Sequence, residues 1–346
     1  MSLSIIEIIR SVLVSQKLTE FFKGVQFTFP GLSPLTFKIT ASSPAKRMQG
    51  YRFNRHSIMT KIEAEGEVVA SGYGESDFEL LALQKSISEA VERCVFKLAK
   101  KLNPDLRSSS GWAAHLTPQK ARAAAQTELL ERDSILLHWL SQTPFLEIAA
   151  HTLPKDLIEW ASKELSLAPR FNQLRILTST LGTAPSVVTI LQDKDGFAFS
   201  SQASSSSLRG AIERALAEVC RIADFAEQGF ISPPDLDKPS SPEGHSVYYA
   251  YHSKLPTWLF GNSILFSAAS RNWNERSRAL KNKLPKSSFS DFQFGPLFVA
   301  HCASKEVQDL FFGSAEAAAS RGWINFEHLE KVCGGRALCS LPHFVP

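Results

Sequence analysis

Two short stretches of the sequence repeat one arrangement of charged side chains, Glu-x-x-Glu-Arg. The stretch "SEAVERCV" carries the first copy and "TELLERDS" the second. Their charged residues are Glu89, Glu92 and Arg93 in the first copy, and Glu128, Glu131, Arg132 and the following Asp133 in the second. Residues three apart share one face of a helix, so the two carboxylates of each copy repel each other unless a cation lies between them. A single copy is ordinarily a solvated helix face with local arginine pairing.

The setting of both copies favours buried carboxylates over a solvated face. Apolar residues surround them in "ISEAVERCVF" and "LLERDSILLHWL", and a buried carboxylate needs a positive partner. A third helix adds Arg214 and Glu218 one turn apart. An oxygen-rich lining suits Mg²⁺, and arginines beside it can hold phosphate groups. The pattern predicts that four or five carboxylates and two or three arginines converge on one cavity.

Other sites built from paired glutamates or glycine-rich loops are not indicated. A di-iron bundle needs histidine three residues after a glutamate, but positions 92 and 131 are both Glu. The chain contains neither a Walker A sequence nor GxGxxG. A nucleotide would therefore be held by side chains and metal rather than by a glycine-rich loop.

Three predicted helices position these residues. Apolar periodicity predicts a helix from about Asp77 to Lys101 for the first copy. Thr117 suits an N-cap, with Pro118 in the first turn, for a helix that runs through the second copy to about Leu140. The Ser-rich loop "SSQASSSS" leads into the third helix, which carries Arg214 and Glu218.

Strands are predicted between these helices, which gives a mixed α/β fold. Two hairpins are expected, one at Glu65-Gly66 and one at Asp195-Gly196. Near the C-terminus, "FQFGPLFVAHCAS" predicts one strand and "SKEVQDLFFGS" a helix. The stretch "ISPPDLDKPSSPEGH" predicts a loop rich in Pro and Ser.

The composition favours a globular cytoplasmic protein. The chain has 346 residues, 44% of them hydrophobic, which suffices for a core in one large domain or two. A net charge of +4 without a Lys/Arg cluster does not indicate nucleic-acid binding. Glu7 and Arg10 interrupt the N-terminal apolar run, which predicts an amphipathic helix rather than a targeting or membrane segment. Five cysteines without a CxxC pair fit reduced thiols.

Four stretches together resemble the YcaO family. They are "ASGYGESDFELLALQKSISEAVER", "SSSGWAAHLTPQKARAAAQTELLERD", "SLRGAIERALAEV" and the proline-bearing C-terminus. The resemblance implies a mixed α/β fold of YcaO type, with helices packed on β-sheets and a glutamate-lined ATP cavity. On this basis residues 1–44 form an N-terminal helix and strand segment, and residues 45–346 form a YcaO-like catalytic domain.

The resemblance implies an enzyme that uses ATP and Mg²⁺ to phosphorylate the oxygen of a peptide backbone amide. A neighbouring Cys, Ser or Thr side chain then attacks the amide carbon, which gives an azoline in a ribosomally made peptide. Another nucleophile would give a thioamide or an amidine with the same site residues. A family member that binds ATP or peptide without turnover, as a scaffold, is the alternative of a different class.

Matching the family motifs implies roles for individual residues. The implied metal ligands are Glu89, Glu92, Glu128, Glu131 and Glu218. The same glutamates would bind ATP together with Arg132 and Arg214, whereas Arg93 is expected to brace its helix. In the tail "LPHFVP", His343 and Pro346 are candidate catalytic residues, because the tail of many relatives reaches the active site.

Two positions depart from the family pattern. Some members carry an acidic ligand where this chain has Lys120, which could contact phosphate, point to solvent or mean that one metal is missing. Prolines alternate in the tail of many cyclodehydratases, whereas here Phe344 and Val345 separate Pro342 from Pro346.

The resemblance also implies a peptide substrate and a partner protein. The chain has no appended domain like the leader-peptide-binding partner of many relatives, so we expect a separate leader-binding or TfuA-like protein to bring the peptide. A homodimer stays open, and neither nucleic acid nor a membrane is an expected partner.

Overall fold

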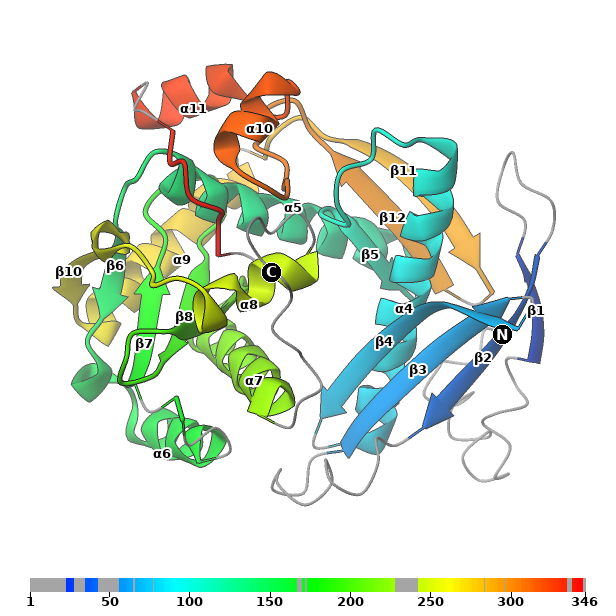
Figure 1. Cartoon of the computed structure of the whole chain (residues 1–346), viewed down its shortest axis with the longest axis horizontal. Coiled ribbons are helices and arrows are strands. Elements are labelled where there is room, and N and C mark those ends of the chain that lie inside the picture. The colour runs from blue at the N-terminus through cyan, green and yellow to red at the C-terminus, as the bar shows by residue number, and fades with distance from the viewer. Residues whose placement is uncertain are drawn as a thin grey trace. The chain divides into compact units, whose positions relative to one another are not determined.

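The computed structural model describes residues 23–27, 35–42, 56–64, 66–76, 78–166, 170–171, 173–227, 242–282, 284–295, 297–334 and 338–344. The chain divides into two compact units (Figure 1). Unit 1 comprises Met1–Gln126 and Ser288–Ala303, and unit 2 comprises Thr127–Ser287 and Ser304–Pro346. The predicted N-terminal helix, most of the Pro- and Ser-rich loop and the last two residues of the tail lie outside the described residues. The predicted boundary between residues 44 and 45 stays a prediction.

Unit 1 contains two antiparallel sheets. The first follows chain order, with strands β1 (Lys23–Phe27), β2 (Leu35–Ser42), β3 (His56–Ala64) and β4 (Glu67–Ser76). The second has the order β11 (Ser288–Phe294), β12 (Leu297–Ala303) and β5 (Trp112–His115). The hairpin predicted at Gly66 is confirmed, with a φ of 86° at this glycine.

The prediction of a single strand near the C-terminus is wrong. That stretch contains the end of β11 and the whole of β12, which pair with each other as neighbouring antiparallel strands. The chain reverses between them at Gly295, whose φ of 57° is one that glycine adopts without strain. The apolar run therefore belongs to two strands, because the glycine inside it marks a turn.

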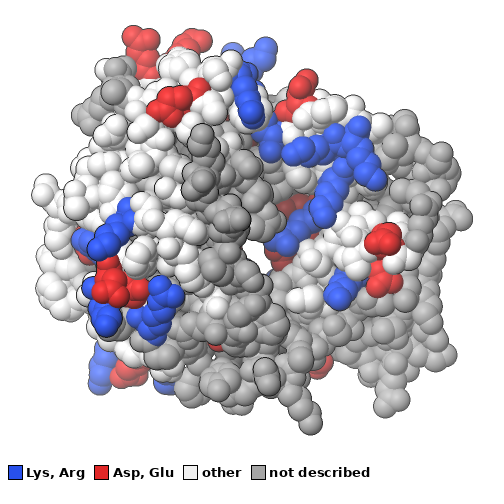
Figure 2. Space-filling view, in the orientation of Figure 1, with Lys and Arg blue, Asp and Glu red and all other residues white. Residues whose placement is uncertain are grey.

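A long helix, α4 (Glu79–Leu102), packs on β3 and β4 and also contacts β5 and β12 (Figure 1). Its prediction from the sequence is confirmed. Gly72 and Gly74 on β4 permit the close packing, because a Cβ atom there would lie 2.2 Å from the carbonyl oxygen of Ser86 and 1.8 Å from that of Ala82, respectively. The other side of α4 is exposed and basic, and Figure 2 shows Lys and Arg side chains gathered over this part of unit 1.

Unit 2 is built on a five-stranded sheet of order β10–β6–β7–β8–β9. Its strands are β10 (Phe260–Ile264), β6 (Phe145–Ile148), β7 (Gln173–Thr178), β8 (Val187–Gln192) and β9 (Ala198–Ala203). β10 and β6 run parallel, and the other neighbours run antiparallel. The hairpin predicted at Gly196 is confirmed, with a φ of 89° at this glycine.

Helices cover both faces of this sheet, which explains why β9 is buried along its whole length. On one face, Ile135 and Trp139 of α5 (Pro118–Leu140) pack with Val188 and Ile190. The other face packs against apolar side chains of α6 (Lys155–Leu165), α7 (Leu208–Glu227), α8 (Pro242–Tyr251) and α9 (Phe266–Asn282).

The two helices that carry the predicted site in unit 2 begin where the sequence indicates. Oγ1 of Thr117 accepts a hydrogen bond of 3.4 Å from the backbone N–H of Lys120, and Pro118 is the first residue of α5. Lys120 itself is exposed. α5 belongs to unit 2 from Thr127 onward, and α7 follows the Ser-rich loop as predicted.

The helix predicted for "SKEVQDLFFGS" is wrong. Residues 304–314 form turns, bends and irregular backbone, and two short helices follow, α10 (Ala315–Ser320) and α11 (Phe326–Cys333). Side chains compete with helical hydrogen bonds here, because the backbone N–H of Gln308 donates to Asp133 at 2.8 Å. Within the described ranges, no helix is long and apolar enough to cross a bilayer.

Candidate functional site

The second Glu-x-x-Glu-Arg motif lies against the end of β9. Oε2 of Glu131 accepts a hydrogen bond of 2.6 Å from the backbone N–H of Ser204, the residue that follows this strand. Oε1 of Glu128 lies 3.9 Å from Nη2 of Arg132. The amide oxygen of Gln202 accepts from both Nη atoms of Arg132 in the orientation that satisfies the two groups. Gln202 and the backbone N–H of Ser204, at the end of β9, therefore hold the motif in place.

The two glutamates of this motif resist ionisation. Burial raises the pKa of Glu131 to about 6; Arg132 opposes this rise, and Glu218 adds to it. Burial also raises the pKa of Glu128, again with Arg132 opposing and with Glu131 and Glu218 adding to the rise. Burial is the larger cause and neighbouring carboxylates add to it, so a cation placed among these groups would favour the ionised forms.

α7 brings Arg214 and Glu218 to the same region. Nη1 of Arg214 lies 3.5 Å from the carbonyl oxygen of Ser204, and its charge opposes the rise in the pKa of Glu131 that burial causes. Oε1 of Glu218 lies 3.5 Å from Nη2 of Arg221. The predicted site residues that unit 2 brings together are Glu128, Glu131, Arg132, Arg214 and Glu218.

The motifs do not predict Gln202, Ser204 or Asp309, which also belong to this region. Asp309 adds to the rise in the pKa of Glu128 that burial begins. Oδ1 of Asp309 accepts a hydrogen bond of 2.8 Å from the backbone N–H of Leu310. The Ser-rich sequence around the end of β9 could have indicated Ser204 as a polar residue of the site. Asp309, by contrast, lies in the segment wrongly predicted as a helix.

Carboxylate oxygens and guanidinium groups are the groups that Mg²⁺ and phosphate bind. In the part of the chain that the structure describes, no group of three His, Cys, Asp or Glu side chains is spaced closely enough to hold a metal ion. Desolvation and the neighbouring carboxylates raise the pKa of Glu128 and of Glu131, and a divalent cation beside them would offset both effects. These residues therefore fit Mg²⁺ whose remaining ligands are phosphate oxygens or water.

The first motif lies on α4 in unit 1. Oε2 of Glu89 accepts a hydrogen bond of 2.5 Å from the backbone N–H of Tyr73, and Oε1 lies 2.6 Å from Nη2 of Arg93. Nη1 of Arg93 donates to the carbonyl oxygen of Ser71 at 3.2 Å. This pair ties α4 to β4, in agreement with the bracing role expected of Arg93. Metal or ATP binding by Glu89 and Glu92 stays a prediction.

The C-terminal tail is held by one side chain at each carbonyl group from Leu341 to Phe344. The donors and acceptors are Trp139 Nε1 and Leu341 O at 3.1 Å, the Tyr249 hydroxyl and Pro342 O at 2.6 Å, His245 Nδ1 and His343 O at 3.0 Å, and Ser200 Oγ and Phe344 O at 2.8 Å. Ser200 and Gln202 share one face of β9, about 7 Å apart along the strand. The described tail therefore ends near the strand face that holds Arg132.

The structure describes one of the two predicted catalytic residues of the tail, His343. The imidazole of His343 is buried, and its Nε2 bonds to the carbonyl oxygen of Phe311. Pro346 lies outside the described residues. Catalytic roles for both stay predictions.

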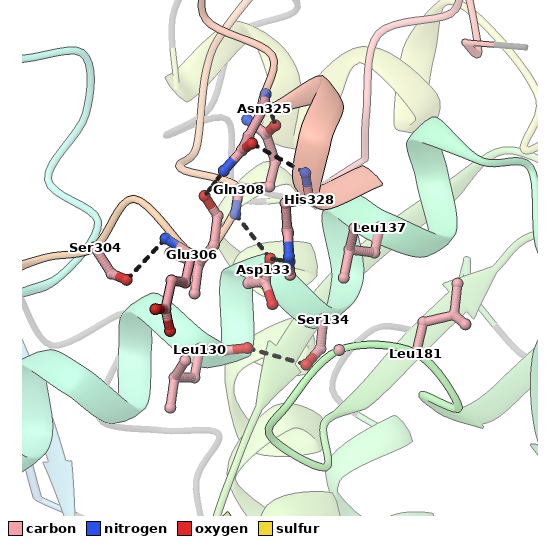
Figure 3. Close-up of polar contacts among 12 residues, drawn as sticks. Leu130, Asp133, Ser134, Leu137, Leu181, Ser304, Glu306, Gln308, Asn325 and His328 are labelled. Atoms are coloured by element: carbon pink, nitrogen blue, oxygen red, sulfur yellow. Dashed lines mark hydrogen bonds and ion pairs between the residues drawn. The ribbon is translucent and has the colours of Figure 1, made fainter. Parts of the chain in front are cut away.

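Asp133, the residue after the motif, contacts the C-terminal segment instead (Figure 3). Its Oδ1 accepts hydrogen bonds from the backbone N–H of Gln308 at 2.8 Å and from Nε2 of His328 at 2.9 Å. Oε1 of Gln308 accepts from the backbone N–H of Asn325 at 2.7 Å, and Oδ1 of Asn325 accepts from that of His328 at 3.1 Å. This ring of hydrogen bonds ties the segment before α11 to α5, one residue beyond the motif.

A sequence profile of the family described as YcaO cyclodehydratase, ATP- and Mg²⁺-binding, matches residues 92–284, which is more than half of the chain. The chain belongs to the YcaO family. The matched range includes Glu92 and every site residue of unit 2 that the motifs predict, whereas Glu89 and the tail lie outside it. No curated protein matches this sequence.

Three solved structures share the YcaO-type mixed α/β fold, which confirms the predicted fold class. A YcaO protein from Methanopyrus kandleri, bound with AMPPCP and Mg²⁺, is 14% identical, with a TM-score of 0.57 over 88% of this chain and 92% of that one. The E. coli microcin synthetase McbBCD complex with pro-MccB17 bound is 14% identical, with a TM-score of 0.50 over 82% and 91%. A heterocyclase in complex with substrate and cofactor is 12% identical, with a TM-score of 0.59 over 96% of this chain and 56% of that one.

Proposed function

We propose that this YcaO protein activates a backbone amide of a peptide by transferring a phosphoryl group from ATP to the amide oxygen. The observation that carries the proposal is the half-buried cluster of Glu128, Glu131 and Glu218, with Arg132 and Arg214 beside it. Burial and the neighbouring carboxylates raise the pKa of Glu128 and of Glu131. The description of the family as an ATP- and Mg²⁺-binding cyclodehydratase supports it. So does the likeness to a microcin synthetase with pro-MccB17 bound and to a heterocyclase with substrate and cofactor.

Each charged group of the site has a role in this proposal. The glutamates of unit 2 that would hold Mg²⁺ are Glu128, Glu131 and Glu218, and the sequence predicts Glu89 and Glu92 as further ligands. Arg132 and Arg214 bind phosphate oxygens, and Gln202 keeps the guanidinium of Arg132 oriented. When bound, ATP would supply the phosphoryl group, and Mg²⁺ would supply positive charge that offsets the negative charge on the transferred group.

Cyclodehydration is the outcome that we propose. A Cys, Ser or Thr side chain of a ribosomally made peptide attacks the activated amide carbon, phosphate leaves with the former amide oxygen, and an azoline ring forms. The same activation with sulfide or an amine as the nucleophile would give a thioamide or an amidine. The mass of the modified peptide distinguishes these products.

We also propose that a separate protein delivers the peptide. The McbBCD structure is a complex of several proteins, which supports an assembly of this kind. The expected partner binds the leader segment of the peptide or resembles TfuA, and a homodimer stays a further prediction. Co-purification from cells that express the chain with neighbouring candidates would test the partner.

The test of the proposal is calorimetric titration with a non-hydrolysable ATP analogue, with and without Mg²⁺. We expect the wild type to bind only with Mg²⁺, and Glu131→Gln to weaken binding by at least about tenfold because it removes a charged ligand. Glu330→Gln, at an exposed position of α11, is the control and should bind like the wild type. A folded wild type without Mg²⁺-dependent binding would contradict the proposal and favour a scaffold role.

A further inference from the structure

A recess of about 230 Å³, lined by both polar and apolar side chains, lies in unit 2 between helix α9 and the loop after β7. Its polar lining includes Thr178, Thr180, Asn272, Glu275 and Arg276. The three residues of α9 are three and four positions apart, so they share one face of that helix. None of these residues takes part in the glutamate site described above.

The loop that forms one wall, residues 179–185, is fastened on two sides. Nη2 of Arg276 donates to the carbonyl oxygens of Leu181 at 2.8 Å and Gly182 at 3.0 Å. Nε2 of His138 on α5 accepts from the backbone N–H of Thr180 at 2.8 Å and of Leu181 at 3.1 Å. Figure 3 shows this loop, with Leu181, lying along α5. The wall is therefore formed before a ligand arrives.

Several side chains of the recess are available to a ligand. Asn272 and Glu275 are exposed, and no residue in the described ranges forms a hydrogen bond or an ion pair with either side chain. The amide of Asn272 offers a donor and an acceptor, Glu275 offers acceptors, and the hydroxyl of Thr178 offers either. Arg276 adds positive charge, because burial lowers its pKa only to about 10.

The recess adjoins the site of Glu131. Pro185 lines the recess, and its carbonyl oxygen accepts a hydrogen bond of 2.9 Å from Oγ of Ser204. Trp273 also lines it, and its Nε1 donates to the carbonyl oxygen of Ser205 at 3.2 Å. Ser204 is the residue whose backbone N–H donates to Glu131. A single residue therefore contacts both the wall of the recess and a glutamate of the proposed nucleotide site.

The size of the recess and its mixed polarity limit what it can bind. Pockets that bury a whole small molecule are typically about 300–1,000 Å³, and this recess of about 230 Å³ is smaller. It suits part of a longer ligand. A peptide group presents one N–H donor and one carbonyl acceptor, which the donors and acceptors of the recess match.

We propose that this recess is a subsite for a short segment of the peptide substrate, bound through its backbone amides by Asn272, Glu275 and Thr178. The inference rests on the proposed function, which supplies a peptide as the ligand. It adds the place where the chain holds that peptide, next to Glu131 and apart from the nucleotide.

The test uses the blocked tripeptide N-acetyl-Gly-Ser-Gly amide as a probe of the full chain, followed by ligand-observed NMR. We expect wild-type binding with a Kd on the order of 1 mM, and Asn272→Trp, which fills the mouth of the recess, to weaken it by at least about tenfold. Glu275→Ala should weaken it by about threefold because one acceptor is lost. Arg278→Trp, exposed on α9 and outside the recess, should bind like the wild type.

Equal binding by the wild type and Asn272→Trp would overturn the proposal, as would no wild-type binding at probe concentrations on the order of 10 mM. Binding of the ATP analogue with Mg²⁺ is measured on the same samples, and its retention shows that each variant is folded. A wild type that does not bind the ATP analogue would contradict the proposed function. The tripeptide result, by contrast, tests only whether the recess binds peptide.

Discussion

Oε2 of Glu131 accepts a hydrogen bond of 2.6 Å from the backbone N–H of Ser204, which joins a glutamate of α5 to the first residue after β9. The hydroxyl of Ser204 makes a different bond, to the carbonyl oxygen of Pro185 at 2.9 Å. The backbone of this residue thus contacts the proposed nucleotide site, and its side chain contacts the wall of the proposed peptide recess. Substitutions at this residue can separate the two roles.

Ser204→Pro should weaken Mg²⁺-dependent binding of the ATP analogue by about tenfold, because proline lacks the N–H that holds Glu131. Ser204→Ala keeps that N–H and should bind within about threefold of the wild type. Calorimetry on both variants, after melting curves confirm that they are folded, makes the comparison. Equal weakening in the two variants would mean that the backbone bond does not position Glu131.

Nucleotide binding should depend on pH through Glu128 and Glu131, the two half-buried glutamates of α5. The pKa of Glu131 is raised to about 6 and that of Glu128 is raised as well, so the unliganded protein favours their protonated forms as the pH falls. If these residues bind Mg²⁺ as proposed, the metal binds the ionised carboxylates and must displace those protons. At pH 5.5 a carboxyl with a pKa of about 6 is only about one-quarter ionised. Binding of the ATP analogue at pH 5.5 should therefore be weaker than at pH 7.5 by at least about fourfold.

Calorimetry at pH 6.5 in buffers of different ionisation enthalpy measures the proton release. Titration of Mg²⁺ into the ATP analogue alone supplies the protons that the analogue itself releases. We expect the complex to release more protons than this reference. A proton count equal to the reference would show that neither glutamate changes ionisation on binding.

The helices and hairpins that frame the site could be predicted because their signals are local. Thr117 and Pro118 mark the start of α5, and Gly66 and Gly196 mark the two hairpins, so each element depends on neighbouring residues. Arg214 and Glu218, one turn apart, predicted that α7 joins the second motif on α5, and the structure brings these residues together. The convergence of the first motif on α4 with them stays a prediction. The strand residues Gln202 and Ser204 carry no comparable pattern.

The segment that carries Asp309 could not be predicted because its partners are remote in sequence. The backbone N–H of Gln308 donates to Asp133, which lies 175 positions away along the chain. Local propensity in "SKEVQDLFFGS" favours a helix, but this long-range bond and buried packing of Leu310 and Phe311 decide the conformation. A carboxylate near Glu128 was therefore assigned to the wrong kind of element.

Asp133→Ala should lower the free energy of unfolding by about 3 kcal/mol, because the backbone N–H of Gln308 and Nε2 of His328 both lose a buried hydrogen-bond acceptor. Glu330→Ala, at an exposed position on the same short helix as His328, should change it by less than about 0.5 kcal/mol. Urea unfolding followed by tryptophan fluorescence measures both. A loss as small as that of the control would show that the ring of hydrogen bonds does not stabilise unit 2.

His138 should make the protein less stable in acid. Its Nε2 accepts two backbone N–H groups, and burial lowers its pKa from the ordinary 6.5 to about 3. Because the folded pKa lies below the unfolded one, the stabilisation is complete above about pH 6.5 and is lost as the pH falls toward 3. Between pH 7.5 and 4.5 this residue should account for about 2–3 kcal/mol of lost stability.

His138→Gln removes this titration and should flatten the change in stability over that range. The variant should also be less stable than the wild type at pH 7.5, by about 1–3 kcal/mol, because a glutamine does not reproduce both sets of ring hydrogen bonds. Urea midpoints of both proteins at pH 7.5 and 4.5 give the comparison. If the variant lost as much stability on acidification as the wild type, the pH dependence would have another source.

Gly74→Ala should destabilise the packing of α4 on β4. A Cβ at this position would lie 1.8 Å from the carbonyl oxygen of Ala82 and 2.5 Å from the backbone nitrogen of Ser86. Both are helix backbone atoms, so the strand and the helix must separate rather than a side chain rotating away, and we expect a loss of about 3 kcal/mol. Val68→Thr, exposed on the same strand, keeps a β-branched side chain and should change stability by less than about 0.5 kcal/mol.

The same variant tests whether Glu89 and Glu92 bind the nucleotide, because α4 carries both residues and must shift to relieve the overlap. If they are ligands, Gly74→Ala should weaken Mg²⁺-dependent binding of the ATP analogue under conditions where the protein stays folded, and Val68→Thr should not. Unchanged binding in a folded Gly74→Ala protein would restrict the nucleotide site to the glutamates of α5 and α7. Undiminished stability of that variant would instead contradict the close contact between Gly74 and α4.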